Sequence, residues 1–383
     1  MRDVFVLGVG QTPVSEQTDS NIRDLGTAAV REALKDAGLI EVDALYVGSM
    51  FSALFSRQQL LAALIAQGAG LAGVEALTVE AACASGAGAV RMGCLAIQAG
   101  VHDVIVACGA EHMTLLDKES TKSALANATD WNMEGRNGEN ILSLNARLMT
   151  LYMEKYGVTS SAFCPFALNA HDNSVTNANA VFRHQIREAD YYNSPVIAGP
   201  LRRLDAAPVC DGAAAIVLGS ERVKSRHAPT VRIRASTVGT DVAALGSRQD
   251  PLRLEAAISS CERAYRQSGL SHTDIDLFEA HDAFTILTIL SLEAAGFSEA
   301  GHGFEPGQTG AIRLDGQIPI STMGGLKARG HPVGASGVYQ IVDAYHQLMD
   351  RAAENQVEGA RIAMTQSFGG LAITAITHIL ERT

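Results

Sequence analysis

The sequence is poor in aromatic residues and has no excess of basic ones. Phe, Trp and Tyr make up only 5% of its 383 residues, and the formal charge is −11. A protein that binds nucleic acid needs a basic face for the phosphates, so we expect no nucleic-acid partner. The apolar runs are short or interrupted by glycine and charge, so we expect no segment that spans a membrane.

Cysteine is also sparse. The six cysteines are scattered without a Cys-x-x-Cys pair, and no secretory leader is recognisable before Asp3. These features favour a reduced, cytoplasmic protein without a structural zinc site or other metal centre. The hydrophobic content of 47% still supports a large core, enough for two or three domains or one fused unit.

Extended and helical patterns alternate in the first hundred residues. The predicted strands are 3–8, 43–47, 76–79 and 103–108. The predicted helices are 22–37, 58–67 and 86–99. Such alternation is typical of α/β layers around a mostly parallel sheet.

The later part of the chain repeats this pattern. GHPVGASGVYQIVDAYHQLM followed by RIAMTQSFGG parallels CASGAGAVRMGCLAIQAG followed by DVIVACGAEH: a small-residue turn, a helix, a strand and a glycine. We therefore expect two copies of one α/β unit, residues 1–225 and 226–383. The first copy is expected to contain an inserted loop domain at about 112–207, where substrate contacts are usual.

The stretch EAACASGAGAV places Cys83 between a predicted strand and a helix that starts near Gly86. Free backbone N–H groups and the positive end of the helix dipole favour a thiolate there, so the sequence predicts a lowered thiol pKa. The surrounding small residues leave room for a bulky acyl group or for the close approach of another backbone. A buried cysteine that serves as a small hydrophobic residue is the alternative.

Two histidines lie where they could act on that thiol. His331, in GHPVGASG, occupies in the second copy the place of Cys83 in the first, so a two-fold arrangement of the copies would bring them together. His281, in FEAHDAFT, follows a predicted strand, at the kind of position where α/β sheets bind ligands. It could donate to a thioester oxygen, or it could be a surface or capping residue. In SFGG, residues 367–370, backbone N–H groups could face an oxyanion, or the two glycines could form an ordinary turn.

Cys83, GHPVGASG and the Gly-Gly loop together resemble the thiolase superfamily, and the resemblance covers essentially the whole chain. The HDAF sequence is closer to archaeal and sterol-carrier-protein thiolases than to those with an Asn-Glu motif. The resemblance implies an αβαβα layered fold in two halves, a homodimer or homotetramer, and coenzyme A thioesters as substrates without a permanently bound cofactor. For archaeal-type relatives it also implies a small OB-fold protein and a hydroxymethylglutaryl-CoA synthase as partners.

The resemblance further implies a role for each site residue. Cys83 takes up the acyl group as a thioester, and His331 activates it. The N–H groups of Cys83 and Gly369 form one oxyanion hole, whereas His281 and His331 form the other.

The sequence departs from the thiolase pattern at two positions, and both affect the expected activity. Ser367 stands where most thiolases have a second cysteine, and Ala283 stands where the sterol-carrier-protein type has it. That cysteine normally carries the α-proton of the substrate, and a serine hydroxyl is too weakly acidic to replace it. His281 and His331 remain as candidates for this step.

We expect an acyl-CoA acyltransferase, either an acetyl-CoA acetyltransferase or a 3-ketoacyl-CoA thiolase. The alternatives are acyl transfer to an acceptor other than coenzyme A, and a thiolase-fold subunit that binds acyl-CoA or lipid or acts as a scaffold. Apolar candidates for an acyl tunnel, which could equally be core residues, are Phe51, Phe55, Met113 and Met133. Basic candidates for the coenzyme A phosphates are Arg147, Arg183, Arg202 and Lys224.

Overall fold

Nine strands form one mixed sheet in the computed structural model, which describes residues 2–223 and 229–383. The strand order is β3-β2-β4-β7-β1-β8-β11-β10-β9. Lys224 and the expected boundary at 225/226 lie outside the described residues.

The sheet consists of two half-sheets. The first contains β3 (Glu75–Val79), β2 (Ala44–Gly48), β4 (Val104–Glu111), β7 (Gly212–Ser220) and β1 (Val4–Gln11). The second contains β8 (Val231–Thr240), β11 (Thr374–Arg382), β10 (Ile362–Gly369) and β9 (Leu277–Glu279). They are joined where β1 pairs antiparallel with β8, at Phe5–Arg232 and Val6–Val231.

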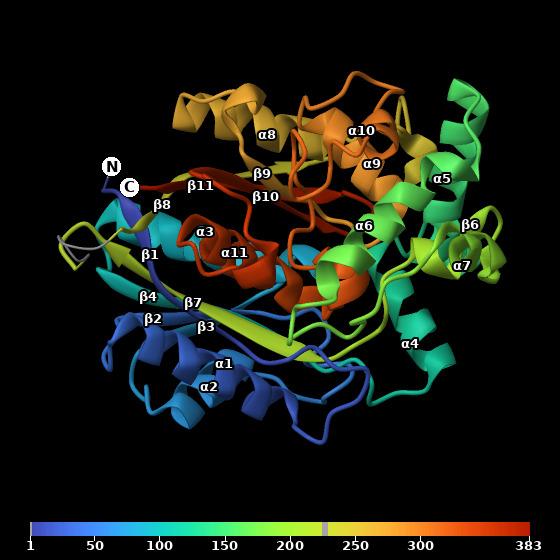
Figure 1. Cartoon of the computed structure of the whole chain (residues 1–383). Coiled ribbons are helices and arrows are strands. Elements are labelled where there is room, and N and C mark those ends of the chain that lie inside the picture. Colours follow the sequence, from blue (N-terminus) through green and yellow to red (C-terminus); the bar gives the residue numbers. More distant parts are fainter. Residues whose placement is uncertain (1, 224–228) are drawn as a thin grey trace.

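Helices cover both half-sheets and fill the space between them (Figure 1). The outer helices are α1 (Ile22–Ala37) and α2 (Leu61–Ala69) on the first half, and α8 (Glu255–Ser268) and α9 (Thr285–Ala294) on the second. The inner helices are α3 (Ser85–Ala99) and α11 (Ser336–Leu348). This order of helix, sheet, helix, sheet and helix confirms the expected layered fold. The expectation of a mostly parallel sheet is wrong, because five of the eight strand pairings in the nine-stranded sheet are antiparallel.

The first helix shows how local signals set the elements. The side chain of Asn21 accepts the N–H of Asp24 at the start of α1, and Gly38 ends the helix at a φ of 66°. The predicted helix 58–67 begins later, at Leu61, because Arg57 and Leu60 have φ values of 51° and 57° that a helix cannot contain.

The first turns of α3 and α11 pack backbone against backbone. A Cβ on Gly86 would lie 2.7 Å from the carbonyl oxygen of Gly334, and one on Gly337 would lie 2.6 Å from the nitrogen of Ala87. The small residues after Cys83 therefore serve this helix contact rather than an acyl group. The contact brings the turn before α3 next to the turn before α11, as the duplication predicts.

The insertion between β4 and β7 reaches across to the second half. Its elements are α4 (Lys118–Leu125), α5 (Ile141–Tyr156), α6 (Cys164–Ser174), α7 (Glu188–Asn193), β5 (Val196–Ala198) and β6 (Leu201–Arg202). Both α5 and α6 pack against α9. The insertion thus lies beside the inner helices, on the right-hand side of Figure 1.

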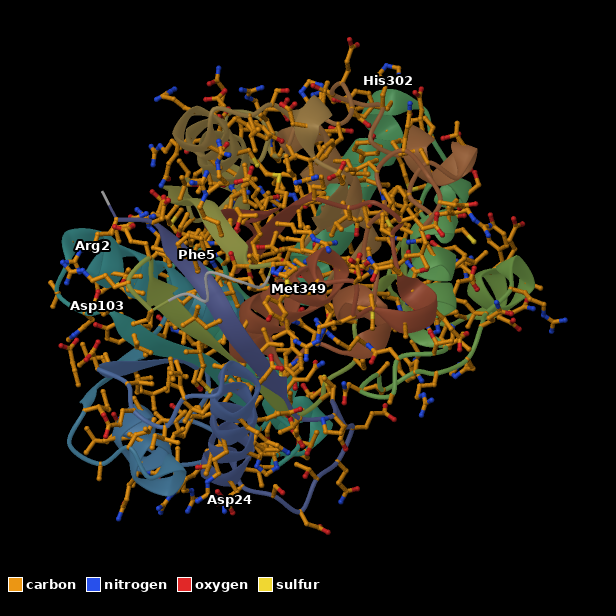
Figure 2. The ribbon with its side chains drawn as sticks, turned by 60° about the vertical axis from the view of Figure 1, so that its left-hand side comes forward. Arg2, Phe5, Asp24, Asp103, His302 and Met349 are labelled. Carbon is orange, nitrogen blue, oxygen red and sulfur yellow. The ribbon has the colours of Figure 1, made fainter. Side chains whose placement is uncertain are left out.

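At the end of the molecule away from the insertion, a polar contact joins the segments that precede β1 and β4. Arg2, just before β1, donates to Asp103, just before β4, at 3.1 Å, and the two side chains meet at the surface (Figure 2). Phe5, three residues further on, is buried. No helix within the described ranges is long and apolar enough to cross a membrane.

Candidate active site

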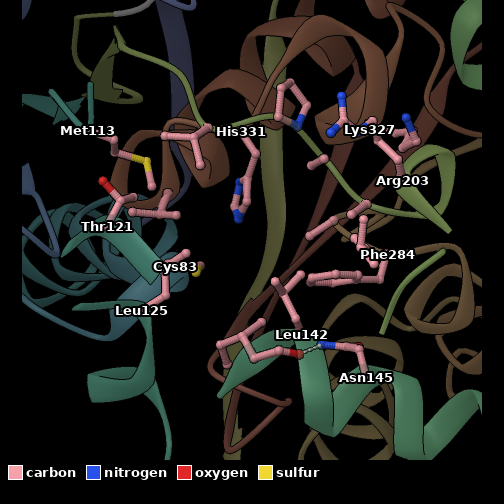
Figure 3. Close-up of a pocket in the computed structure, with 18 of the residues that line it drawn as sticks. Cys83, Met113, Thr121, Leu125, Leu142, Asn145, Arg203, Phe284, Lys327 and His331 are labelled. Atoms are coloured by element: carbon pink, nitrogen blue, oxygen red, sulfur yellow. Dashed lines mark hydrogen bonds between the residues drawn. The ribbon is translucent and has the colours of Figure 1, made fainter. Parts of the chain in front are cut away.

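A cavity of about 840 Å³ lies between the insertion and the starts of the inner helices. Cys83, His281 and His331 all line it, and Cys83 and His331 extend into it from opposite sides (Figure 3). The insertion contributes apolar side chains, among them Leu125, Ile141 and Leu142. The fold therefore brings the three residues singled out in the sequence to one enclosed space.

Cys83 lies in a 3₁₀ turn, Ala82–Ala84, directly before α3. Burial and the nearby Glu111 carboxylate raise its pKa to about 12, although its own N–H and that of Gly370 act in the opposite direction. The expected lowering of the thiol pKa is therefore wrong. The loss of water around the sulfur outweighs the helix dipole and the backbone donors.

Glu111, at the end of β4, is a buried carboxylate that the sequence analysis missed. It accepts the N–H groups of Met50, Phe51 and Gly334 at 2.8 to 3.0 Å, and the hydroxyl of Ser49 at 3.1 Å. It thus joins the loop after β2 to the turn that follows His331. Burial raises its pKa to about 7 despite these donors. The sequence contained one signal for this residue: Glu111 is the only acidic residue in the otherwise apolar stretch 104–111.

Its surroundings make His331 a neutral base. Its Nδ1 lies 2.7 Å from Oγ of Ser336, whose single hydrogen has two acceptors in reach, Nδ1 itself and the carbonyl of Pro332 at 3.1 Å. When that hydrogen goes to the carbonyl, Nδ1 carries the ring hydrogen and Nε2 keeps the lone pair. Burial, and then His281 and Arg329, hold the pKa of His331 well below its usual range.

His281 has the opposite arrangement. The backbone N–H of Phe368 donates to its Nδ1 at 3.2 Å, so Nε2 carries the hydrogen. Burial lowers the pKa of His281 to about 3, so the ring is a neutral donor. The ring centres of His281 and His331 are 5.3 Å apart.

The Gly-Gly loop approaches the cysteine turn closely. A Cβ on Gly369 would lie 2.4 Å from the carbonyl oxygen of Ala81, and Gly370, at a φ of 60°, lines the cavity. Ser367 is buried, and its hydroxyl has no hydrogen-bond partner in the described part of the chain. Ala283, in contrast, is one of the residues that line the cavity.

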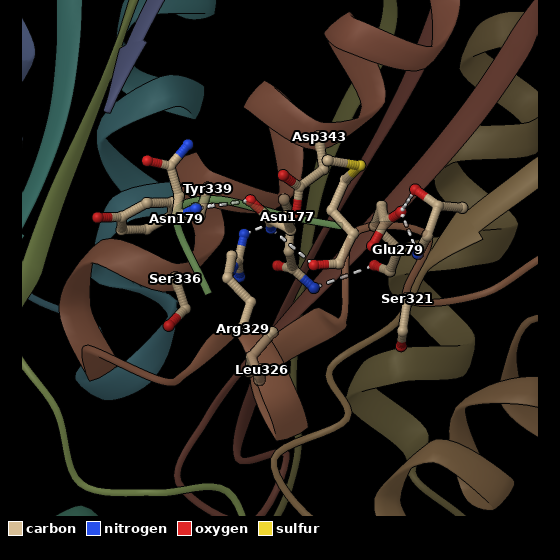
Figure 4. A network of polar contacts seen from close by, with 12 residues as sticks. Asn177, Asn179, Glu279, Ser321, Leu326, Arg329, Ser336, Tyr339 and Asp343 are labelled. Atoms are coloured by element: carbon tan, nitrogen blue, oxygen red, sulfur yellow. Dashed lines mark hydrogen bonds and ion pairs between the residues drawn. The ribbon is translucent and has the colours of Figure 1, made fainter. Parts of the chain in front are cut away.

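A buried polar network, which Figure 4 shows around Arg329 and Asp343, holds the segments that carry both histidines. Arg329, two residues before His331, forms an ion pair with Asp343 at 2.6 Å. The amide of Gln340 donates to the carbonyls of Glu279 and Ala280, directly before His281. These contacts fix the two backbone segments from which the imidazoles project.

Few of the predicted substrate contacts hold. Among the described residues, Met113 is the only one of the four tunnel candidates that lines the cavity. Phe51 and Phe55 stack on each other with ring centres 4.4 Å apart, and Met133 is exposed. Phe51 and Phe55 are therefore core residues, and Met133 is a surface residue.

The basic candidates also lie elsewhere. Arg147 and Arg183 are exposed, outside the described cavity lining, and Arg202 donates to the carbonyls of Tyr192 and Ser194. The cations that do line the cavity are Arg203, on the insertion, and Lys327, four residues before His331. No signal in the sequence separated Arg203 from its neighbour Arg202.

Comparisons with known proteins agree with this fold. Residues 4–222 match the family model "Thiolase, N-terminal domain", and residues 237–382 match "Thiolase C-terminal domain-like". The layered halves and the two matches define a thiolase-type acyltransferase. The chain belongs to the thiolase family.

Relatives with this architecture include both types that HDAF suggested. An "Acetyl-CoA acetyltransferase" of Methanothermobacter thermautotrophicus is 40% identical over 100% of both chains. "Sterol carrier protein 2" of Gallus gallus is 28% identical over 96% of this chain and 70% of its own length. A solved "Ltp2-ChsH2(DUF35) aldolase" has a TM-score of 0.85 at 24% identity, covering 99% of this chain and 98% of its own, which shows a common fold.

Proposed function

We propose that the protein transfers acyl groups between coenzyme A thioesters through a covalent intermediate on Cys83, as an acetyl-CoA acetyltransferase or 3-ketoacyl-CoA thiolase. The observation that carries the proposal is the pair of buried imidazoles that line the same cavity as this thiol: His281, with a donor at Nε2, and His331, to which we assign the tautomer with a base at Nε2. The relative named acetyl-CoA acetyltransferase supports the choice of reaction.

In the first half-reaction, Nε2 of His331 takes the proton of Cys83 as the sulfur attacks the thioester carbonyl. The bond between the carbonyl carbon and the coenzyme A sulfur then breaks, and His331 returns the proton to the leaving thiolate. A raised thiol pKa fits this order, because the buried site favours a neutral thiol and imidazole until the acyl group arrives. The N–H groups of Cys83 and Gly369 are proposed to stabilise the oxyanion.

In the second half-reaction, His281 donates Nε2–H to the carbonyl oxygen of the second acyl-CoA. We assign removal of the α-proton to His331, which is neutral again once coenzyme A has left. The bond from Phe368 to Nδ1 favours His281 as a donor rather than a base. The resulting carbanion attacks the acyl carbon on Cys83 and releases the thiol, which regains its proton from His331.

A thiolysis assay tests this function. Purified protein is mixed with acetoacetyl-CoA and free coenzyme A, acetyl-CoA is measured, and Cys83→Ala is the control. Turnover that depends on Cys83 is expected. Acetylated Cys83 without turnover would point to another acceptor or a missing partner, whereas no acetylation at all would favour the binding-module alternative.

We also propose that the chain forms a homodimer or homotetramer. Strand β3 is at the edge of the sheet, and its Leu77 is 53% exposed, so this edge is free to pair with a second copy. Light scattering of the protein and of Leu77→Lys tests the proposal, since a charge in that edge should shift the mass toward the monomer. A cytoplasmic location and the two partner proteins implied by the resemblance remain expectations.

A further inference from the structure

Lys327 is a buried cation that makes no hydrogen bond and no contact ion pair within the described part of the chain. It lies in a π-helical turn, Gly325–Arg329, and its side chain is 2% exposed and lines the same cavity as Cys83. An ammonium group without partners inside a protein is costly, so this arrangement suggests that a ligand supplies the missing partner.

The two carboxylates whose charges act on this ammonium group already accept hydrogen bonds from other residues. Asp205 accepts the hydroxyls of Tyr191 and Thr285 at 2.7 and 2.6 Å, and Asp282 accepts the N–H of Leu326 at 2.6 Å. They act on Lys327 only through space, raising a pKa that burial brings down to about 8. The charge is therefore largely retained at neutral pH while its hydrogens are left free for a ligand.

A second unpartnered polar group lines the cavity near Lys327. His171, on α6, donates from Nδ1 to the carbonyl of His184 at 3.2 Å, and its buried Nε2 has no partner among the described residues. Burial and the charge of Lys327 lower its pKa to about 3. Phe182 links the segments that carry Lys327 and His171. Its ring stacks on His171, and the backbone N–H of Phe182 donates to the carbonyl of Ala328, the residue after Lys327, at 3.1 Å.

We propose that Lys327 and His171 form a subsite for a carboxylate carried by the acyl chain of the substrate, so that the protein prefers dicarboxylic acyl-CoA thioesters. Phe284 and Leu287 line the same cavity and suit the methylene groups of such a chain. The bound carboxylate accepts hydrogens from Lys327. By cancelling that charge it also removes the second cause, after burial, of the lowered pKa of His171, and a proton at Nε2 would make this ring a second donor.

The test compares thioesters that differ only in the carboxylate. Succinyl-CoA is paired with 4-methylpentanoyl-CoA, and glutaryl-CoA with 5-methylhexanoyl-CoA, because an isopropyl group has nearly the shape of a carboxylate. Affinities are measured by calorimetry on Cys83→Ala, in which no acyl transfer can occur. We expect at least one carboxylate member to bind about 10- to 100-fold more tightly than its partner, and Lys327→Met to abolish this preference.

Two controls separate recognition from folding and from contacts with coenzyme A. Lys155→Met removes a surface lysine that is paired with Asp250, and it should keep the preference. Lys327→Met should also melt at a higher temperature, since it removes an unpaired buried charge; a lower melting temperature would indicate a structural lysine. Pantetheine thioesters of the same acids should show the same dependence on Lys327. If only the coenzyme A thioesters depend on it, Lys327 binds a phosphate and the proposal is wrong.

The subsite proposal rests on the proposed function, but the two can fail separately. No preference at either chain length in the Cys83→Ala protein would overturn the subsite, even if thiolysis is observed. Absence of acylation by every thioester, together with a clear carboxylate preference in binding, would overturn the acyl-transfer chemistry and leave the subsite in place.

Discussion

The imidazoles of His281 and His331 lie edge to face, with ring planes at 86° and ring centres 5.3 Å apart. Their supporting contacts differ: the N–H of Phe368 donates to Nδ1 of the first ring, whereas Nδ1 of the second lies 2.7 Å from the hydroxyl of Ser336. The first ring therefore presents a hydrogen at Nε2, and to the second we assign a lone pair at Nε2. Burial keeps both neutral, so the division of roles depends on these two contacts.

Ser336→Ala should impair acylation of Cys83 by removing the contact that holds His331 in one tautomer. We expect a loss of about 10- to 100-fold in kcat/KM, comparable to that for outer contacts of other functional histidines. Ser260→Ala, in the outer helix α8, is the matched buried control. A loss of folding rather than of rate, seen by circular dichroism, would contradict this positioning role.

Alkylation of Cys83 by iodoacetamide should rise about tenfold for each pH unit between 7 and 11. The reason is that a thiol with a pKa of about 12 contributes little thiolate in this range. Peptide mapping measures the rate at Cys83, with the fully buried Cys94 as an internal control that should react only after unfolding. A plateau below pH 9 would restore the lowered pKa that the sequence suggested.

His281→Ala should abolish carbon–carbon bond chemistry while still allowing acylation of Cys83. Loss of one oxyanion donor costs about 100- to 1,000-fold in kcat. His281→Asn should recover part of this loss because an amide N–H can donate in the same direction. Mass spectrometry of the acyl-enzyme separates the two half-reactions, and unchanged thiolysis in the alanine variant would remove His281 from the mechanism.

Ala283→Cys should increase thiolysis, because position 283 lines the cavity and a thiol there could carry the α-proton. We expect a gain of about tenfold or more. Ser367→Cys is the comparison: Ser367 is 1% exposed and outside the described cavity lining, so this variant should change little. The reverse result would place the proton carrier on the Gly-Gly loop.

Glu111 should make the protein less stable as the pH rises from about 4.5 to 7. Its pKa is higher in the folded protein than in the unfolded chain, so the folded state binds more protons in that window and loses stability as the pH increases. The effect is on the order of 3 kcal/mol. Glu111→Gln should flatten this part of the stability curve in urea titrations; an unchanged slope would mean that other carboxylates dominate it.

Local sequence was enough for most of the framework. The bounds of α1 follow from a capping asparagine and a terminal glycine, both of which act within one helical turn. The duplication also allowed the meeting of Cys83 and His331 to be predicted, because equivalent turns of two similar units face each other across the central helices. Patterns of small and apolar residues are sufficient for such inferences.

The electrostatic properties of the site were decided only by the tertiary structure. The pKa of Cys83 depends on burial by the insertion and on Glu111, which lies on a different strand. The free charge of Lys327 likewise depends on Asp205 and Asp282 having other partners. Desolvation and charge pairing depend on which distant segments enclose a group, and neighbouring residues in the sequence do not determine that.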